Sequence, residues 1–226
     1  MRDRDAAILG SASAERPGAT ILTMSDTKLR ELERRWKETG SLDDEAAYLR
    51  ERVRAGGLSS ECLELAAFCG HGAACRALSS AVPDVSGDLV EWAGGLQRWG
   101  QVAATVAALS AAKQVLPGIR KRDERRRANV ALVRVAAWLR CPCDTHRERA
   151  AESASHLCWP GLAKGTRAAQ MAAETACSGT EWTSGRTDAE RAQIAIGSAQ
   201  RAGPVEARDV LDDVARWALD GAVPGI

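Results

Sequence analysis

Apolar side chains recur every three or four residues along most of this chain, and that spacing is typical of amphipathic helices. Leu29, Leu32 and Trp36 follow it and predict a helix over about 27–39. Ser41 can cap a second helix, which the next pair of glycines ends. The two segments together predict a helical hairpin.

The same spacing continues through the rest of the chain. Two short helices are expected between Ser59 and Leu78, with a break at Gly70-His71-Gly72. One long helix is expected over 88–115, although glycines inside it weaken it. Further helices are expected over about 123–140, 145–158, 162–177, 188–201 and 205–219. We find no alternating pattern that would predict a strand, so the sequence predicts an all-α multi-helix bundle of about eight to ten helices without a sheet.

The helix over 123–140 has two apolar faces. One carries Leu132, Val135 and Leu139, and the second carries Val130 and Val133. A helix that is apolar on two faces is expected at the centre of a bundle.

The predicted elements divide the chain into three parts. Residues 1–23 combine glycine, proline and serine without a sustained period, which predicts a disordered or extended arm. Residues 24–80 are expected to form helical hairpins, and residues 85–226 a larger helical bundle.

Composition narrows the kind of protein further. The 226 residues include seven Trp but one Phe and one Tyr, so alanine, leucine and valine must fill most of the core. The net charge of +1 provides no overall field for nucleic acid, and we expect neither nucleic acid nor a membrane as partner. The chain opens Met1-Arg2-Asp3 without a secretion signal, so we expect a cytoplasmic protein with reduced thiols.

Charge is distributed unevenly along the chain. Residues 120–149 contain ten basic and four acidic residues, whereas residues 180–226 contain five basic and eight acidic ones. The basic segment 120–127 either pairs with the acidic C-terminal helices or binds an acidic partner, and we favour internal pairing. The candidate contact residues are Arg120, Arg122, Arg125, Arg127, Trp159 and Trp182.

Cys141, Cys143 and His146 form the most unusual cluster in the sequence. Two thiols and an imidazole within six residues indicate either a zinc site or a redox-active thiol pair, against the alternative of inert thiols. A fourth zinc ligand would have to be His156 or Cys158. A second, incomplete cluster is made of Cys69, His71 and Cys75. We expect no metal to be bound at either cluster.

Motifs for catalysis are missing from the sequence. It has no phosphate-binding glycine loop, no dinucleotide fingerprint, no nucleophile elbow and no paired zinc histidines on one helix. We therefore expect a protein that is not an enzyme and needs no cofactor.

Two stretches resemble known proteins. Residues 29–71 resemble a module of uncharacterised helical proteins from bacteria with large genomes. Residues 85–220 resemble immunity proteins of bacterial polymorphic-toxin systems, in which a helix opens Asp-x-Arg-Pro-Arg-x-Ala and reaches a tryptophan about two turns later. Asp123, Arg125 and Arg127 match that opening and Trp138 is the tryptophan, whereas Arg126 replaces the proline. Asn129 replaces the final alanine of the motif.

The expected function is accordingly binding of another protein without catalysis. The resemblance implies an inhibitor of the immunity type, whose partner would be a toxin. The alternative function is a metal- or thiol-dependent protein that uses Cys141, Cys143 and His146.

Overall fold

The computed structural model describes residues 18–84, 87–158, 160–178 and 185–225. These residues form eleven α-helices and two short 3-10 helices and contain no strand, which confirms the predicted all-α class. The α-helices are α1 (Gly18–Thr39), α2 (Leu42–Arg54), α3 (Ser60–Phe68), α4 (Gly72–Ala77), α5 (Leu89–Gly94), α6 (Gly100–Val115), α7 (Arg122–Arg140), α8 (Asp144–His156), α9 (Lys164–Ala176), α10 (Asp188–Ala202) and α11 (Ala207–Asp220).

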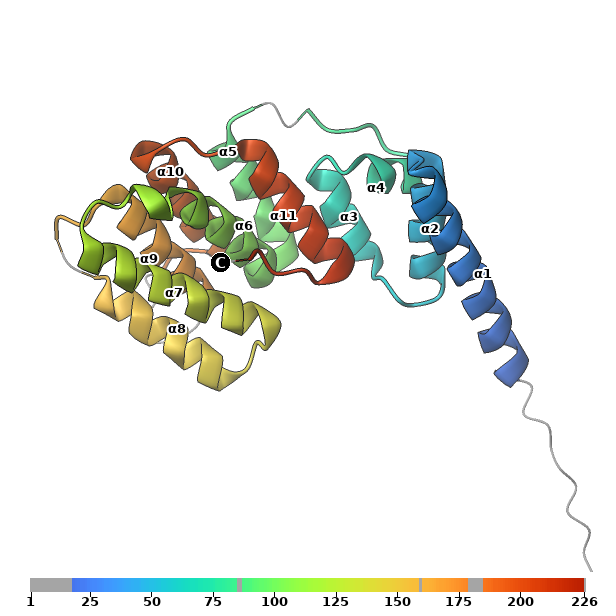
Figure 1. Ribbon diagram of the computed structural model, residues 1–226, viewed down its shortest axis with the longest axis horizontal. Helices are drawn as coiled ribbons and strands as arrows, with labels where there is room; N and C mark the ends of the chain where they lie inside the picture. The colour runs from blue at the N-terminus through green and yellow to red at the C-terminus, as the bar shows by residue number, and fades with distance from the viewer. Residues whose placement is uncertain (1–17, 85–86, 159, 179–184, 226) are drawn as a thin grey trace, which may run out of the picture.

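The helices form an elongated array (Figure 1). The hairpin of α1 and α2 lies at one end, and α7, α8 and α9 lie toward the other. Between them, α11 packs on α3 on one side and on α6 on the other. Helix α6 also contacts α7, α9 and α10, so it is the centre of the larger bundle.

Alanine builds most of the core, as the composition predicts. Every residue from Ala103 to Ala112 on α6 is buried. Small side chains let neighbouring helices approach closely, and the bulky Leu96, Leu132 and Trp138 fill the remaining space. Trp99 lies at the edge of this core and is half-buried.

The long helix predicted over 88–115 is wrong in one respect, because the chain forms three pieces there. Helix α5 ends at Gly94, a 3-10 helix covers Gly95–Trp99, and α6 begins at Gly100. Gly100 has φ +74° and ψ −164°, a conformation open almost only to glycine. The apolar spacing continues across the break, so periodicity alone could not locate it.

Several predicted boundaries also shift. Helix α1 begins at Gly18 and not near Thr27, so the last residues of the expected arm 1–23 are helical, and residues 1–17 lie outside the described residues. Ser41 caps α2 as predicted and accepts a hydrogen bond from the Asp43 backbone. The last helix, expected over about 205–219, is α11 and starts only after Glu206.

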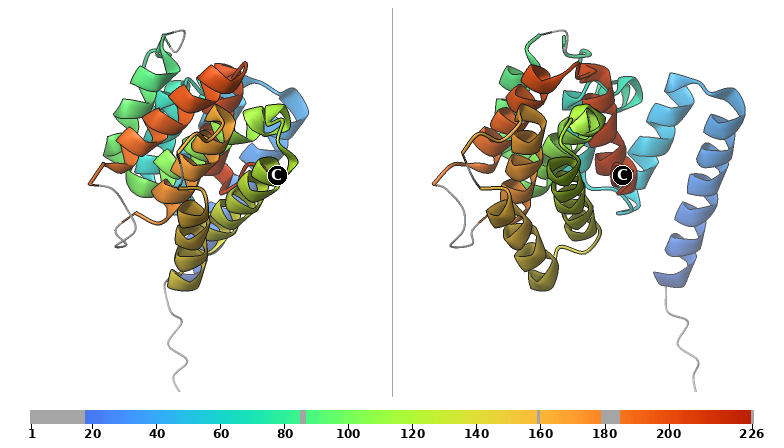
Figure 2. Two further views of the ribbon diagram at one scale, coloured as in Figure 1. Left: turned by 90° about the vertical axis from the view of Figure 1, so that its left-hand side faces the viewer. Right: turned by 60° about the vertical axis from the view of Figure 1, so that its left-hand side comes forward.

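The N-terminal hairpins are packed on the larger bundle. Arg52 on α2 forms an ion pair with Asp220 at 3.1 Å and donates to the Leu219 carbonyl at 2.8 Å. Figure 2 shows α1 at the outer edge of the array, and its principal neighbour is α2. None of the helices in the described ranges has both the length and the apolar character needed to cross a membrane.

Candidate functional site

Helix α7 carries the basic segment that the sequence singles out. Its first turn contains Asp123 and Glu124, which suit the positive end of the helix dipole. Glu124 turns inward and is buried, where it accepts hydrogen bonds from the Ala163 backbone and the Thr166 hydroxyl at the start of α9. The neighbouring Lys121 ammonium, with these two donors, lowers the pKa of the Glu124 carboxyl. The Glu124 carboxylate therefore has a structural role at the contact between α7 and α9, and the arginines that follow it lie on the exposed side of α7.

The outer side of α7 combines charge with exposed apolar surface. Arg122, Arg125 and Arg126 are exposed and form no hydrogen bond or ion pair with another described side chain. One to three turns further along, Val130 and Val133 are 43% and 47% exposed. We call these five residues the arginine–valine face. The prediction that both apolar sides of this helix are buried is wrong, because α8 and α9 cover only the side that carries Leu132.

A shallow groove runs beside this face, between α7 and α8. Its volume is about 210 Å³. Arg134 lies along it and donates to Glu152 at 2.8 Å and to the Ser153 hydroxyl at 3.0 Å, so its guanidinium is neutralised. The residues that line the groove are Arg126, Arg127, Val130, Arg134, Ser153, His156 and Leu157.

The favoured internal pairing with the C-terminal helices is not found for Arg122, Arg125 and Arg126 within the described residues. On α11, Asp212 pairs with Arg208, and Asp213 pairs with Arg216 at 2.6 Å. Asp213 also accepts a hydrogen bond from Ser110. These two carboxylates find their partners within their own helix and on α6.

The remaining predicted contact residues do not all belong to the arginine–valine face. Arg120 lies apart from it, in a pocket of about 370 Å³ shared with Lys164 and Arg201. Arg127 lines the groove, and Trp159 and Trp182 lie outside the described residues. Sequence reasoning missed the exposure of Val130 and Val133; their position beside three consecutive arginines was the available signal.

The second candidate site is the turn between α7 and α8. The Cys143 backbone N–H donates to the Cys141 carbonyl at 2.8 Å across Pro142, which is the hydrogen bond of a three-residue γ-turn. Proline restricts the backbone of the central residue, and the tight turn holds the two thiols together. One turn into α8, His146 places its Nδ1 atom 3.0 Å from the Cys143 sulfur. The two sulfurs and an imidazole nitrogen all lie within 4.8 Å of one another.

The electrostatics of this turn separate the two thiols. The His146 backbone N–H, the Cys141 thiol and the His146 imidazole lower the pKa of Cys143 to about 7. The same contact with Cys143 raises the pKa of the Cys141 thiol. Because Cys143 precedes the first turn of α8, its thiolate also benefits from the positive end of the helix dipole.

The proposed fourth ligands are too far away. His156 is the last residue of α8 and Cys158 lies just beyond it, and a rise of about 1.5 Å per residue places His156 about 20 Å from Cys143. Within the described residues, Cys141, Cys143 and His146 are the one group of three possible ligands that the fold brings together.

The second cysteine and histidine cluster is not assembled. Cys69 is buried, and burial raises the pKa of its thiol. His71 caps α4 by accepting a hydrogen bond from the Ala74 backbone. Cys75 is buried and donates to the Ala67 carbonyl. Each of these side chains has a structural contact, and their sulfur and nitrogen atoms do not converge.

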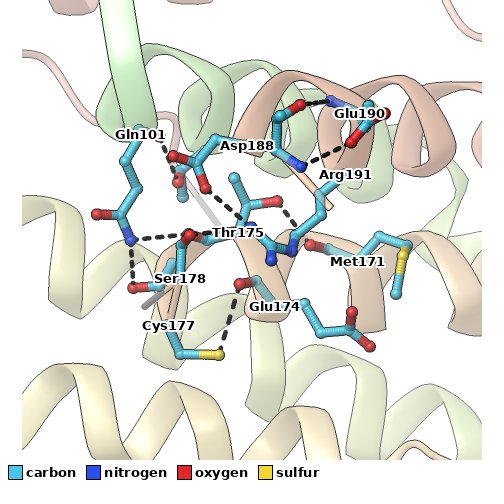
Figure 3. A network of polar contacts seen from close by, with 12 residues as sticks. Gln101, Met171, Glu174, Thr175, Cys177, Ser178, Asp188, Glu190 and Arg191 are labelled. Carbon is cyan, nitrogen blue, oxygen red and sulfur yellow. Dashed lines mark hydrogen bonds and ion pairs between the residues drawn. The ribbon is translucent and has the colours of Figure 1, made fainter. Parts of the chain in front are cut away.

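A buried polar network joins α9 and α10 (Figure 3). The Arg191 guanidinium is 2% exposed and contacts the Asp188 carboxylate at 3.0 Å and the Ser178 hydroxyl at 2.9 Å. Gln101 donates to the Thr175 and Ala176 carbonyls at the end of α9. The network supplies hydrogen-bond donors to carbonyls at the C-terminal end of α9 that have no partner within the helix, which is a structural role.

Comparison of the chain with protein-family models, with curated proteins and with solved structures finds no match.

Proposed function

We propose that this protein binds another protein through the arginine–valine face of α7, and that the contacting surface of the partner is acidic. The observation that supports this proposal is a group of three arginines that have no partner among the described residues and lie directly beside two exposed valines. Asp212 and Asp213 of α11, which could have neutralised them inside the molecule, are paired with Arg208 and Arg216 instead.

This combination matches the chemistry of protein interfaces. Such interfaces have an apolar centre and a polar rim, and arginine is enriched among the residues that dominate binding. Val130 and Val133 would supply apolar contacts, and the unpaired guanidiniums would steer an acidic partner toward them and fix its orientation.

The proposed role is binding without catalysis. The resemblance of residues 85–220 to immunity proteins makes a toxin the class of partner to test first. In that form of the proposal, α7 covers an acidic surface of the toxin and the bound complex is inactive.

Site-specific photocrosslinking in the native host tests the proposal. A photoreactive residue replaces Val133 in one bait and Leu42 in a matched control. Leu42 is also apolar and exposed, at 52%, but it lies at the start of α2, far from the arginines. We expect a protein adduct from position 133 that is absent from position 42 and whose crosslinked surface is acidic.

The charge dependence of this adduct gives the second measurement. Arg125→Glu with Arg126→Glu should abolish the adduct from position 133 while leaving the melting temperature within about 1 °C, because neither arginine has an internal partner. An adduct that persists undiminished in the double variant, or an identical adduct from both positions, would contradict the proposal.

A further inference from the structure

Against the expectation from the sequence that no metal is bound here, we propose that Cys141, Cys143 and His146 bind one Zn²⁺ ion with two sulfur ligands, one nitrogen ligand and a fourth position open to water. The proposal is independent of the binding function of α7. It follows from the convergence of three side chains that are metal ligands in proteins, at the turn between two helices.

The distances between the three ligand atoms suit a tetrahedral zinc ion. Zinc–sulfur bonds of about 2.3 Å and zinc–nitrogen bonds of about 2.0 Å place neighbouring ligand atoms about 3.5–3.8 Å apart. The Cys143 sulfur and His146 Nδ1 are 3.0 Å apart, and all three atoms lie within 4.8 Å of one another. Side-chain adjustments of about 1 Å would therefore bring all three to one ion.

The surroundings permit these adjustments. Cys141 is exposed, and Cys143 and His146 are half-buried, so the three side chains can rotate without disturbing the core. The γ-turn at Pro142 fixes the backbone between the two thiols, and α8 fixes the backbone of His146. Because the backbone that carries the ligands is held before an ion enters, less conformational entropy is lost on binding.

The chemistry of the ligands favours zinc over harder ions. Thiolate sulfur selects thiophilic ions such as Zn²⁺, whereas Mg²⁺ and Ca²⁺ prefer oxygen ligands. Within the described residues no fourth ligand atom converges with these three, and the neighbouring Asp144 carboxylate pairs with Arg147 at 2.9 Å. Three protein ligands with one solvent position is the arrangement of open zinc sites, in contrast to closed structural sites with four.

Cobalt spectroscopy on the reduced, full-length chain tests the site. Co²⁺ is added without oxygen, and the thiolate-to-cobalt absorption and the d–d bands that report tetrahedral coordination are recorded. Zn²⁺ is then added to displace the cobalt. We expect saturation at about one ion per chain, displacement by Zn²⁺, and no displacement by Mg²⁺.

Single variants identify the ligands. Cys141→Ser and Cys143→Ser should each weaken the sulfur absorption, His146→Ala should alter the d–d bands, and each should lower affinity by more than about 10-fold. Cys158→Ser is the matched control, because it removes another exposed thiol at the far end of α8 and should change nothing. Circular dichroism establishes that every variant is folded.

Three results would overturn the proposal. The first is a reduced protein that gives no cobalt spectrum. The second is a spectrum that survives in Cys143→Ser or is lost in Cys158→Ser. The third is a reduced protein that binds no metal but whose mass decreases by two hydrogens under mild oxidation, with this decrease absent in Cys143→Ser. That result would identify a redox pair at this turn.

Discussion

Neighbouring residues on α7 differ in burial, and this difference determines how much a substitution at each position changes the free energy of unfolding. Leu132 is fully buried, whereas Val133 is 47% exposed. We expect Leu132→Ala to lower the free energy of unfolding by about 2–5 kcal/mol, because it leaves a cavity in the core. Val133→Ala is the control and should change stability by less than about 0.5 kcal/mol. Denaturant unfolding measures both, and equal effects would mean that α7 is rotated relative to the described structure.

Glu51 gives a pH-dependent prediction at the same scale. The Arg54 guanidinium on α2 and the Lys28 ammonium on α1 hold the pKa of its carboxyl down to about 2. A lowered folded-state pKa stabilises the protein above about pH 4.5, and this contribution is lost as the pH falls toward 2. The melting temperature of Glu51→Gln should therefore fall less than that of wild type between pH 5 and pH 2. Glu31→Gln, an exposed position on α1, should follow wild type; parallel curves for Glu51→Gln and wild type would refute this role.

At the scale of elements, the sequence predicted where helices are but not always where they stop. Caps and glycines adjacent to a change of pattern, such as Ser41 and Ser59, marked boundaries that the structure confirms. The sequence did not predict the break at Gly94–Gly100, because the apolar period continues across it. Its cause is a backbone conformation and the Phe68 ring packed against Gly95, where a Cβ atom would lie 2.6 Å from the ring. A contact between residues so far apart in sequence has no signature in a local pattern.

Gly100 provides the test of that explanation. Gly100→Ala places a side chain at φ +74° and ψ −164°, and we expect a loss of about 1–3 kcal/mol in stability. Gly118→Ala is the matched control, because Gly118 lies in open space without a positive φ. Thermal unfolding of both variants decides the matter. A neutral Gly100→Ala would show that α5 and α6 can join without strain.

The candidate site was also only partly predictable, because a sequence pattern reveals neighbours in the chain but not contacts between distant residues. The cluster of Cys141, Cys143 and His146 is local, so the sequence revealed its members, although the distance to His156 required the length of α8. The arginines were also visible in the sequence. Whether they pair internally depended on the packing of α11 against α3 and α6, where Asp212 and Asp213 find partners on α11 and α6. Counting charges along the sequence does not show which helices pack against each other.

At the scale of the molecule, the question is whether the N-terminal hairpins and the larger bundle unfold together. One apolar cluster runs from Leu49 on α2 to Leu219 on α11. Phe68 on α3 packs against this cluster, with its ring 5.6 Å from Trp92 and 4.6 Å from Trp99. A continuous core predicts one cooperative unit for α2 to α11. Helix α1 is expected to open at lower free energy, because it packs mainly on α2.

Hydrogen exchange of Phe68→Ala tests this cooperativity. The substitution should cost on the order of 1–3 kcal/mol, below the range for a fully buried ring, because Phe68 is half-buried. If the helices unfold as a single unit, this loss of unfolding free energy affects every helix. Amides of α2 and of α9, which lie on opposite sides of α11, should then lose hydrogen-exchange protection by the same amount. Tyr48→Ala, which removes a ring stacked on Trp36 of α1, is the control and should chiefly affect α1 and α2. Protection lost in α3 and α4 alone after Phe68→Ala would mean that the hairpins form a separate unit, since a joint core transmits destabilisation to all of its members.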